Sequence, residues 1–506
     1  MSRRRKRATR ERPNVDVSHR RRMENPFEPL KVLSDDAVNQ LHETAIQYLA
    51  DEGVRVLFDE ARDIFRDAGC RVDDDEMMVC LDPENIRTAL TSAPSQFELQ
   101  APNPERSLSV GGRSVALVPV GGPPFVSDRD RGRRSGTMED QQNFLRLTQI
   151  YDVLAVASPC IEPDDLPLNT RHLTSGLNTL TLTDKSPFIY ARGRHRVRDM
   201  FDLVKIRYGI EDDATFADAH RCWTNINTNS PRQLDIPMSM GIIDFAKMNQ
   251  PCIMTPFTLA GAMAPVTLAG ALLVQHMEVL AAVTLAQLVK PGAPVLYGAF
   301  TSNVDMKSGS PAFGTPEAMR GALASGQLAR HVGLPWRSSG SSSSNAVDAQ
   351  AGYETMANTY GAMLGGANWI QHAAGWQEGG LVASFEKFIV DVEMCQIMAD
   401  LFKPVVVNDD ELALGAISEV GPGGHFFGTP HTLERFETAF YDPLVFSRTN
   451  FEQWTEEGSQ ETDERATATW KAALDSYIQP PIDEAVLTEM SDFVARRDEE
   501  GGAPPD

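Results

Sequence analysis

The chain has 506 residues, of which 42% are hydrophobic and 23% charged, and its formal net charge is −23. This is the composition of an ordinary globular protein, and it excludes collagen, a coiled coil and a wholly disordered chain. The negative charge argues against a nucleic-acid-binding protein, because phosphates are bound by basic surfaces. No uninterrupted apolar run approaches the roughly 20 residues of a membrane-spanning helix, so we expect no membrane partner.

Positive charge is concentrated at the N-terminus, between Arg3 and Arg22. This stretch lacks the apolar core of a signal peptide. The six cysteines show no CxxC spacing, which is typical of a reducing compartment and gives no disulfide or zinc signature. We therefore expect a cytoplasmic protein. Residues 1–25 are predicted to be a disordered basic arm, with contact to RNA or acidic lipid as the less favoured alternative.

Residues 26–110 are predicted to form a helical lead-in. A first amphipathic helix is expected to be capped by Ser34 and to end at Gly53, and a second to run from Asp59 to Ala68. A third helix begins around Pro83, because proline is well tolerated in a first helical turn. Strands are predicted to follow near Leu99 and over residues 115–120.

From residue 111 to residue 402 short apolar runs alternate with long helical patterns. Repetition of strand, loop and helix indicates parallel strands joined by crossover helices. The expected helices cover 266–288, 316–331, 349–364 and 381–401, and the expected strands lie at 115–120, near Ser158, and at PFIYA, CWTNIN, CIMTPF, PVLYGAF, LPWRSS and ANWIQHA. Eight strands predict a (β/α)8 TIM barrel within the α/β class. An open doubly wound sheet is the alternative, but it normally carries a glycine-rich phosphate turn, which GGPPF is not.

The chain beyond the barrel is predicted to be a helical extension over residues 403–495 and a disordered acidic tail over 496–506. Chemistry in such barrels lies in the loops that follow the strands. The loop containing Ser338–Ser344 is rich in glycine and serine, and we interpret it as a lid or substrate loop rather than a flexible linker.

Aromatic residues gather at or just beyond the predicted strand ends. Aromatic faces attract cations, and they are used to recognise quaternary ammonium groups. The cluster therefore predicts a cation-binding cavity, although packing in the barrel core is the favoured explanation of any one of these residues taken singly. Its members are Phe257, Tyr297, Phe300, Trp336, Trp369 and Trp376.

Two titratable residues stand beside this cluster and are the candidate catalytic groups. His372 follows a strand, where an imidazole can orient a carboxylate or act as acid or base; the alternative is a satisfied core histidine. Glu378 can complement a cationic substrate or cap a helix that opens at Leu381. His425 and His431 lack the spacing and the carboxylate of a metal triad, so no metal site is expected. The sequence has no GxSxG elbow, P-loop or CxxC. This indicates that the reactive group is supplied by a cofactor or by a second protein.

At these same loops the chain resembles the trimethylamine methyltransferase family of corrinoid-dependent enzymes. The resemblance covers nearly the whole chain from Leu33, and its most specific stretches are VTLAGALLVQHMEVLAAVTLAQLVKPGAPVLYG, GLPWRSSG with VDAQAGYET, ANWIQHAAGWQEGG with SFEKFIVD, and GPGGHFFGTPHT. It implies a (β/α)8 barrel that transfers a methyl group from an amine to the cobalt of a corrinoid (cobalamin) held by a separate partner protein, with no cofactor bound in this chain.

The resemblance also implies a substrate class. Archaeal members place pyrrolysine in the loop after the GLP strand, and the matching position here is Ser341. Serine offers no electrophilic imine, so the match indicates the branch that demethylates quaternary amines such as glycine betaine. A quaternary amine already carries a neutral leaving group, so the barrel has only to hold the cation and aim a methyl group. Arg337 is expected to fix a substrate carboxylate through paired hydrogen bonds.

Three alternatives to this interpretation remain open at the level of the sequence. The chain could be a non-catalytic barrel that binds a quaternary amine or docks a corrinoid protein, a trimethylamine methyltransferase, or a zinc-dependent methyltransferase whose ligands are distant in sequence. We further expect a homo-oligomer.

Overall fold

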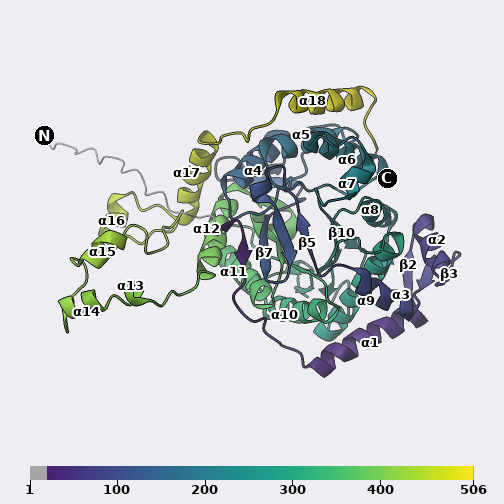
Figure 1. Ribbon diagram of the computed structural model, residues 1–506, viewed down its shortest axis with the longest axis horizontal. Coiled ribbons are helices and arrows are strands. Elements are labelled where there is room, and N and C mark those ends of the chain that lie inside the picture. Colours follow the sequence, from purple (N-terminus) through teal and green to yellow (C-terminus); the bar gives the residue numbers. More distant parts are fainter. Residues whose placement is uncertain (1–19, 505–506) are drawn as a thin grey trace.

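The computed structural model describes residues 20–504 and has an α/β fold, with a ring of helices around central strands (Figure 1). Six of these strands are parallel neighbours in the order β10-β12-β14-β17-β18-β7. Their bounds are Thr224–Thr228 (β10), Cys252–Pro256 (β12), Val295–Gly298 (β14), Trp336–Ser339 (β17), Trp369–Ala374 (β18) and Ser114–Pro119 (β7). The strand predictions at these positions are confirmed.

Two further expected strands, near Ser158 and at PFIYA, occur only as isolated parallel bridges. Leu117 pairs with Leu154, Ala157 with Pro187, and Phe188 with Trp223. Pro159 and Pro187 lie in these segments, and proline has no N–H to donate to a ladder. The ladder on this side is therefore short.

Crossover helices cover the outside of the strands. They are α4 (Met138–Ile150), α5 (Arg171–Leu182), α6 (Arg194–Tyr208), α7 (Asp213–Ala217), α8 (Ile236–Lys247), α9 (Leu268–Val289), α10 (Pro316–His331), α11 (Ala349–Leu364) and α12 (Phe385–Leu401). The bounds of α10 and α11 are as predicted. Helix α12 begins four residues later than predicted, because residues Val382–Ser384 form β20 and the Ser384 hydroxyl then accepts from the Lys387 amide at 3.2 Å.

Helix α9 is the one helix among the described residues that is long and apolar enough, by length and composition alone, to cross a membrane. It contains no uninterrupted apolar run of about 20 residues, because Gln275, His276 and Glu278 interrupt it. In its most apolar window 78% of the residues are buried inside the protein. It also carries the buried side chains His276 and Glu278. We therefore interpret α9 as the central core helix.

The lead-in contains the three predicted helices, α1 (Asp35–Asp51), α2 (Asp59–Asp67) and α3 (Pro83–Ser92). The Ser34 hydroxyl accepts from the Ala37 amide at 3.2 Å, which confirms the predicted cap. The segment is not purely helical, however. It also contains the strands β2 (Val54–Val56), β3 (Arg71–Asp73), β4 (Met78–Cys80), β5 (Gln96–Leu99) and β6 (Leu108–Gly111), of which β2 to β4 form a sheet with β11 (Gln233–Leu234).

Both ends of the folded body extend further than the sequence predicts. Arg20 pairs with Asp400 at 3.0 Å, and β1 (Met23–Glu24) lies antiparallel to the start of β7. The prediction of a disordered arm is therefore wrong for residues 20–25, and residues 1–19 lie outside the described chain. At the other end the Ala503 amide donates to the Asn169 carbonyl at 2.9 Å. The prediction of a disordered tail is therefore wrong for residues 496–504. Residues 505–506 lie outside the described chain.

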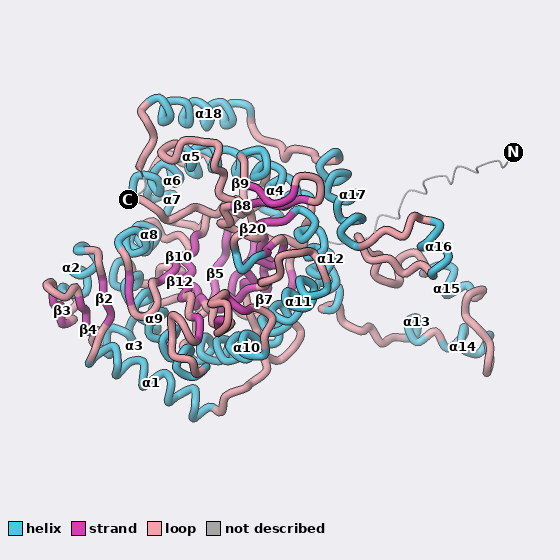
Figure 2. The backbone as a smooth tube through the Cα atoms, turned by 180° about the vertical axis from the view of Figure 1, so that it is seen from behind, coloured by secondary structure: helices cyan, strands magenta, loops and turns pink. Residues whose placement is uncertain are grey.

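The C-terminal extension is helical, as predicted, but only part of it packs on the body (Figure 2). Its helices are α13 (Asp409–Leu412), α14 (Leu414–Val420), α15 (Pro430–Arg435), α16 (Phe451–Glu456), α17 (Thr462–Asp475) and α18 (Glu484–Glu499). Helix α17 packs on α12, where the Trp470 indole donates to Glu386 at 2.9 Å. Helix α18 lies over α5 and α6 and pairs Arg497 with Asp199 at 2.8 Å. Helices α13 to α16 project away from the body.

Candidate functional site

A cavity of about 360 Å³ opens at the carboxyl ends of the parallel strands. Ligand sites in α/β folds lie at this edge of the sheet. Residues from almost every strand or strand-like segment line it, which is why the site is assembled from positions spread over 260 residues. The lining is formed by Gly121, Gly122, Ser158, Phe188, Tyr190, Ala191, Arg192, Asn225, Asn227, Met238, Thr255, Phe257, Phe300, Arg337, Gln371, His372, Trp376, Gly379, Gly380 and Leu381.

Five of the nine predicted site residues line this cavity: Phe257, Phe300, Arg337, His372 and Trp376. The rings of Phe257 and Phe300 are stacked, with centroids 4.9 Å apart. The His372 and Trp376 rings lie 3.9 Å apart, and Phe300 meets Trp376 edge-on at 6.1 Å. Together they form a continuous aromatic wall.

Arg337 brings a buried positive charge to this wall. Its side chain leaves β17, and its guanidinium carbon lies 5.4 Å from the centre of the Phe300 ring. One nitrogen, Nη1, donates to the Ala299 carbonyl at 3.3 Å, and Nε has no partner in the protein. Burial lowers the pKa of Arg337 to about 9. None of the cavity-lining residues is an aspartate or glutamate, so this cation has no carboxylate of its own there.

His372 reaches the cavity through an irregularity in β18. The strand register shifts between Ile370 and Ala374, and His372 has a positive φ of 59°. Bulges of this kind re-aim side chains beside active sites. Burial and the neighbouring Arg337 charge hold the pKa of His372 well below its usual value, so the imidazole is neutral at physiological pH.

Four residues that line the cavity each carry a buried polar atom without a hydrogen-bond partner in the protein. These atoms are Tyr190 Oη, Arg337 Nε, His372 Nδ1 and Trp376 Nε1. Buried polar atoms are nearly always paired, so these four are the candidates for hydrogen bonds to a bound ligand or solvent. Tyr190 was not among the predicted site residues, although it is the fourth residue of PFIYA, a segment predicted to be a strand.

Tyr297 and Trp336 are in the core and not in the cavity, which corrects their assignment to the substrate site. The Tyr297 hydroxyl lies 2.9 Å from His276 Nδ1 and accepts from Gln275 Nε2 at 3.2 Å. The Trp336 ring packs so closely on Gly326 and Gly365 that a Cβ at either would meet ring atoms within 3 Å. Successive residues of a strand face opposite sides, so Trp336 faces the helices while Arg337 faces the cavity. Trp369 also lies in the core, against Trp223 at 4.7 Å.

Glu378 does not line the cavity either, although Gly379 and Gly380 do. Its carboxylate pairs with Arg133 Nε at 2.9 Å, and the Arg133 guanidinium lies 3.8 Å from the centre of the Phe125 ring. The carboxylate is therefore already neutralised outside the cavity. The predicted pairing of Glu378 with a cationic substrate is not what this geometry shows.

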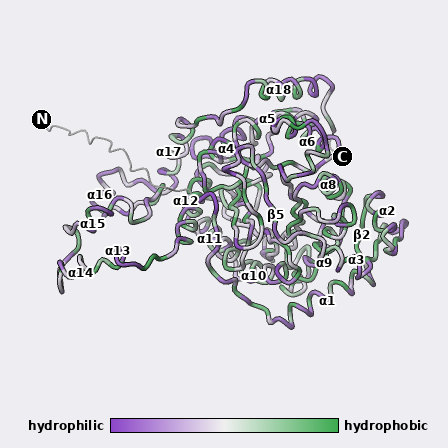
Figure 3. Tube along the Cα trace, in the orientation of Figure 1, coloured by the Kyte–Doolittle hydropathy of each residue, from purple (hydrophilic) through white to green (hydrophobic). Residues whose placement is uncertain are grey.

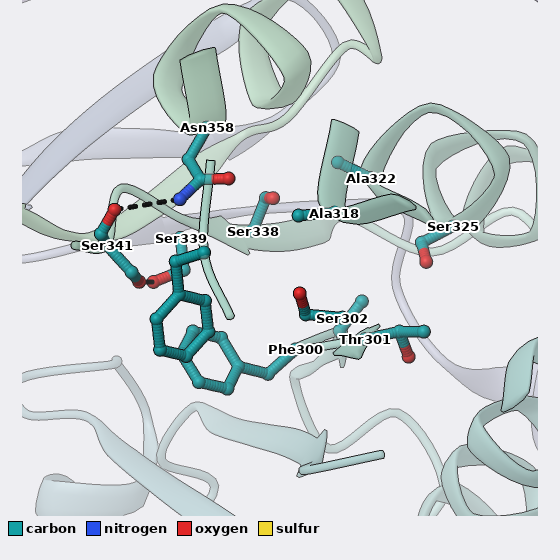
Figure 4. Close-up of a pocket in the computed structure, with 12 residues that line it drawn as sticks. Phe300, Thr301, Ser302, Ala318, Ala322, Ser325, Ser338, Ser339, Ser341 and Asn358 are labelled. Carbon is teal, nitrogen blue, oxygen red and sulfur yellow. Dashed lines mark hydrogen bonds between the residues drawn. The ribbon is translucent and has the colours of Figure 1, made fainter. Parts of the chain in front are cut away.

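Ser341 borders a smaller cavity of about 30 Å³ that shares the Phe300 wall (Figure 4). Its hydroxyl lies 2.7 Å from that of Ser339, and its carbonyl accepts from Asn358 Nδ2 at 2.8 Å. The serine-rich loop is packed into the body, with six of the seven residues from Ser338 to Ser344 buried. Glu354, a residue that the sequence analysis did not single out, holds it by accepting from the Ser342 hydroxyl at 2.8 Å and the Ser343 amide at 2.7 Å.

Metal-binding and thiol chemistry find little support in the described part of the chain. Residues 20–504 contain no group of three His, Cys, Asp or Glu side chains arranged to hold a metal ion. All six cysteines are free, and burial raises the pKa of Cys160 to about 12. What the site offers chemically is a set of hydrogen-bond donors and a cation beside aromatic faces.

Comparison with known proteins gives a consistent picture. The family described as trimethylamine methyltransferase (MTTB) matches residues 1–502. The chain is 34% identical to a glycine betaine methyltransferase of Desulfitobacterium hafniense (strain Y51), over 93% of this chain and 98% of that protein. It is 28% identical to a trimethylamine methyltransferase of D. hafniense (strain DSM 10664 / DCB-2), over 93% and 94% of the two chains. The crystal structure of the Methanosarcina barkeri monomethylamine methyltransferase superposes with a TM-score of 0.46 and 10% identity, covering 93% and 88%. The family match over residues 1–502 and the 34% identical relative show that the chain belongs to the trimethylamine methyltransferase family and is a methyl-transferring enzyme.

Proposed function

We propose that this enzyme transfers a methyl group from a betaine-type quaternary amine to the Co(I) corrinoid of a partner protein. The observation that carries the substrate class is the lining of the large cavity. It places a buried arginine and unpaired donors beside stacked aromatic rings and includes no carboxylate. A simple cation would meet the uncompensated charge of Arg337, whereas a zwitterion brings its own anion.

In this proposal the two halves of the substrate are bound by different groups. The carboxylate accepts from Arg337 Nε and Trp376 Nε1, both of which lack a protein partner, and the neutral imidazole of His372 donates to it as well. The trimethylammonium group packs against the Phe257 and Phe300 rings, whose faces attract cations. The name of the glycine betaine methyltransferase relative supports the same class.

The transfer itself requires no acid or base from the chain. The carbon–nitrogen bond breaks with its electron pair going to nitrogen, which leaves as a neutral tertiary amine. The methyl group passes to Co(I), which is formally oxidised to Co(III) as the cobalt–carbon bond forms. The cavity residues orient one methyl group and exclude water. Glu378, paired with Arg133 outside the cavity, then serves to fix the Gly379–Gly380 wall.

We infer further that the central strands close into a (β/α)8 barrel. Support comes from the pairing of β18 with β7 and from the bridges that continue from Leu117 to Leu154, from Ala157 to Pro187 and from Phe188 to Trp223, next to β10. Counting the two bridged segments gives eight parallel segments around the ring, the number of a TM barrel.

The test is methylation of chemically reduced cobalamin by the full-length chain, followed through the visible spectrum of the cobalt. Glycine betaine should give methylcobalamin, and trimethylamine should give none. Turnover of trimethylamine with no turnover of any betaine would overturn the substrate class. Binding of a betaine without methyl transfer, even with a corrinoid protein present, would favour a non-catalytic binding protein.

A further inference from the structure

A second pocket, of about 170 Å³, lies between α5 and α6 and beside the large cavity. Phe188, Tyr190 and Arg192 line both spaces, which therefore share one wall. The rest of the lining of this α5–α6 pocket comes mainly from the two helices and is different from that of the cavity. Figure 3 shows α5 and α6 beneath α18, each with hydrophobic and hydrophilic residues. The pocket thus borders the proposed substrate site and has a mixed apolar and polar lining of its own.

His172 on α5 gives this pocket a hydrogen-bond acceptor. Its Nε2 lies 3.0 Å from the Asp199 carboxylate, and only 9% of its side chain is exposed. Burial acts to raise the pKa of Asp199, but hydrogen bonds from His172 and Arg497 lower it overall, so Asp199 is an ionised acceptor. Nε2 therefore carries the hydrogen, and Nδ1 of the neutral ring carries a lone pair. Nδ1 has no hydrogen-bond partner among residues 20–504, so a ligand with an N–H group would complete its bonding.

Arg171, the residue before His172, gives the same pocket a hydrogen-bond donor. Its Nη1 donates to Glu162 at 3.3 Å, and its Nη2 donates to the Leu166 carbonyl at 3.0 Å. Its Nε is buried and has no partner in the described part of the chain. Arg192 adds a second guanidinium, whose carbon lies 5.9 Å from the centre of the Tyr190 ring. Groups that bind an anion therefore lie next to an acceptor for an N–H group.

We propose that the α5–α6 pocket is a product site, which binds the tertiary amine left by methyl transfer as a zwitterionic N,N-dialkyl amino acid. This proposal rests on the proposed function. In that reaction the amine leaves with a free electron pair on nitrogen, and it then takes up a proton from the solvent. The product therefore carries one N–H group, which donates to His172 Nδ1. Its carboxylate accepts from Arg171 Nε, and its N-methyl groups pack against Met200 and Phe188.

The same groups select against the substrate. A quaternary ammonium has four carbons on nitrogen and no hydrogen to donate, so it would leave His172 Nδ1 buried and unpaired. A site built around a hydrogen bond strongly rejects an analogue that cannot make it. The large cavity has the reverse preference, because aromatic faces bind a cation without any N–H group. The two spaces thus separate product from substrate across their shared wall, and the cavity is free for the next substrate while the product is still bound.

Two methionine methyl groups report on the two spaces separately. Met200 lines the α5–α6 pocket, and Met238 lines the large cavity. The experiment titrates the full-length chain, labelled with carbon-13 at the methionine methyl groups, with N,N-dimethylglycine or glycine betaine and follows both signals by NMR. Met200→Leu and Met238→Leu identify the two signals. N,N-dimethylglycine should shift the Met200 signal, with or without saturating glycine betaine. Glycine betaine should shift the Met238 signal and leave that of Met200 in place.

His172→Phe removes the acceptor and keeps an aromatic ring, and it should weaken the binding that shifts Met200 by roughly tenfold or more. Leu168→Trp is the second variant, in case the first does not fold. Leu168 lines the pocket and is 49% exposed, so a larger side chain there should be tolerated and should narrow the pocket. His195→Phe is the matched control, because His195 is exposed and lines neither space. It should change neither titration.

The proposal is overturned if N,N-dimethylglycine shifts only the Met238 signal, or if both pocket variants keep the wild-type affinity. A Met200 shift with equal affinity for glycine betaine would also overturn it, because the pocket would then not distinguish an N–H group. The Met200 titration needs no cobalt. A Met200 response in a chain that transfers no methyl group would therefore count against the proposed function and not against binding of the tertiary amine.

Discussion

The guanidinium carbon of Arg337 lies 5.4 Å from the centre of the Phe300 ring, on the wall of the large cavity. A group that binds anions and a face that binds cations are therefore neighbours. A ligand that satisfies both must carry its negative group close to its ammonium group, as a short betaine does. This relationship separates betaines from amines that bear only a positive charge, and it can be tested with two ligands that differ in little else.

Arg337→Met should weaken glycine betaine binding by about 1.5–3 kcal/mol, the usual contribution of a hydrogen bond to a charged group. Choline lacks the carboxylate, so its affinity should be unchanged or improved once the buried positive charge is removed. Isothermal titration with both ligands, on both proteins, measures the effect. Equal losses for choline and glycine betaine would show that Arg337 supports the cavity wall without contacting a carboxylate.

Trp376 and Trp336 should respond in opposite ways to replacement by alanine. Trp376 lines the cavity and its indole Nε1 is proposed to donate to the substrate carboxylate, so Trp376→Ala should weaken betaine binding by about 1.5–3 kcal/mol. Trp336 is buried against Gly326 and Gly365, so Trp336→Ala should lower the free energy of unfolding by about 3–5 kcal/mol. Ligand titration and urea unfolding of the two variants give the comparison. A binding defect in a folded Trp336→Ala protein, with none in Trp376→Ala, would reverse the assignment.

The fold was predictable from the sequence wherever local signals agreed. The start of α10 was predicted at residue 316 and that of α1 after the cap Ser34, because caps and first-turn prolines act within a few residues. The start of α12 was mispredicted because β20 is defined by its pairing with β8 (Phe125–Asp128), about 250 residues earlier in the chain. Such long-range pairing leaves no local signal.

The site was predictable only in part, for a related reason. Alternation along β17 indicates that Trp336 and Arg337 face opposite sides, but it does not say which side is the cavity. Glu378 looked free because its partner Arg133 lies on β9 (Gly132–Ser135), far away in the sequence. Tyr190 lies in a segment with only isolated bridges, so no regular strand pattern pointed to it.

A buried ion pair behind the cavity should be essential for stability and for the shape of the aromatic wall. Lys387 Nζ pairs with Asp391, whose second oxygen accepts from the Gly375 amide at 2.9 Å, one residue before Trp376. Asp391→Ala leaves a buried charge and this amide unpaired, and it should cost about 3–5 kcal/mol of the free energy of unfolding. The double variant with Lys387→Met and Asp391→Leu should recover most of that loss.

The recovered double variant also shows whether the pair positions the site. The Gly375 amide remains unpaired in it, so the fluorescence of Trp376 and the affinity for glycine betaine should still differ from those of the wild type. The matched control is the same double substitution carried by Trp376→Phe, in which the fluorescence difference should disappear. Wild-type affinity in the double variant would limit the pair to a purely structural role.

The affinity for glycine betaine should be constant between pH 6 and pH 8 and should fall above about pH 9. Over the lower range the imidazole is already neutral, since burial and Arg337 hold the pKa of His372 well below its usual 6.5. The fall follows from Arg337, whose pKa burial lowers to about 9. The protonated guanidinium is the form that holds the carboxylate, so a bound carboxylate raises the pKa of Arg337, and binding near pH 9 takes up protons. Titration calorimetry in buffers of different ionisation enthalpy measures that uptake directly.

Choline is the control, because without a carboxylate its binding should take up no protons and should not weaken above pH 9. A change in betaine affinity centred near pH 6.5 would mean that His372 titrates in the cavity, and it would then have to be treated as a charged partner of the substrate.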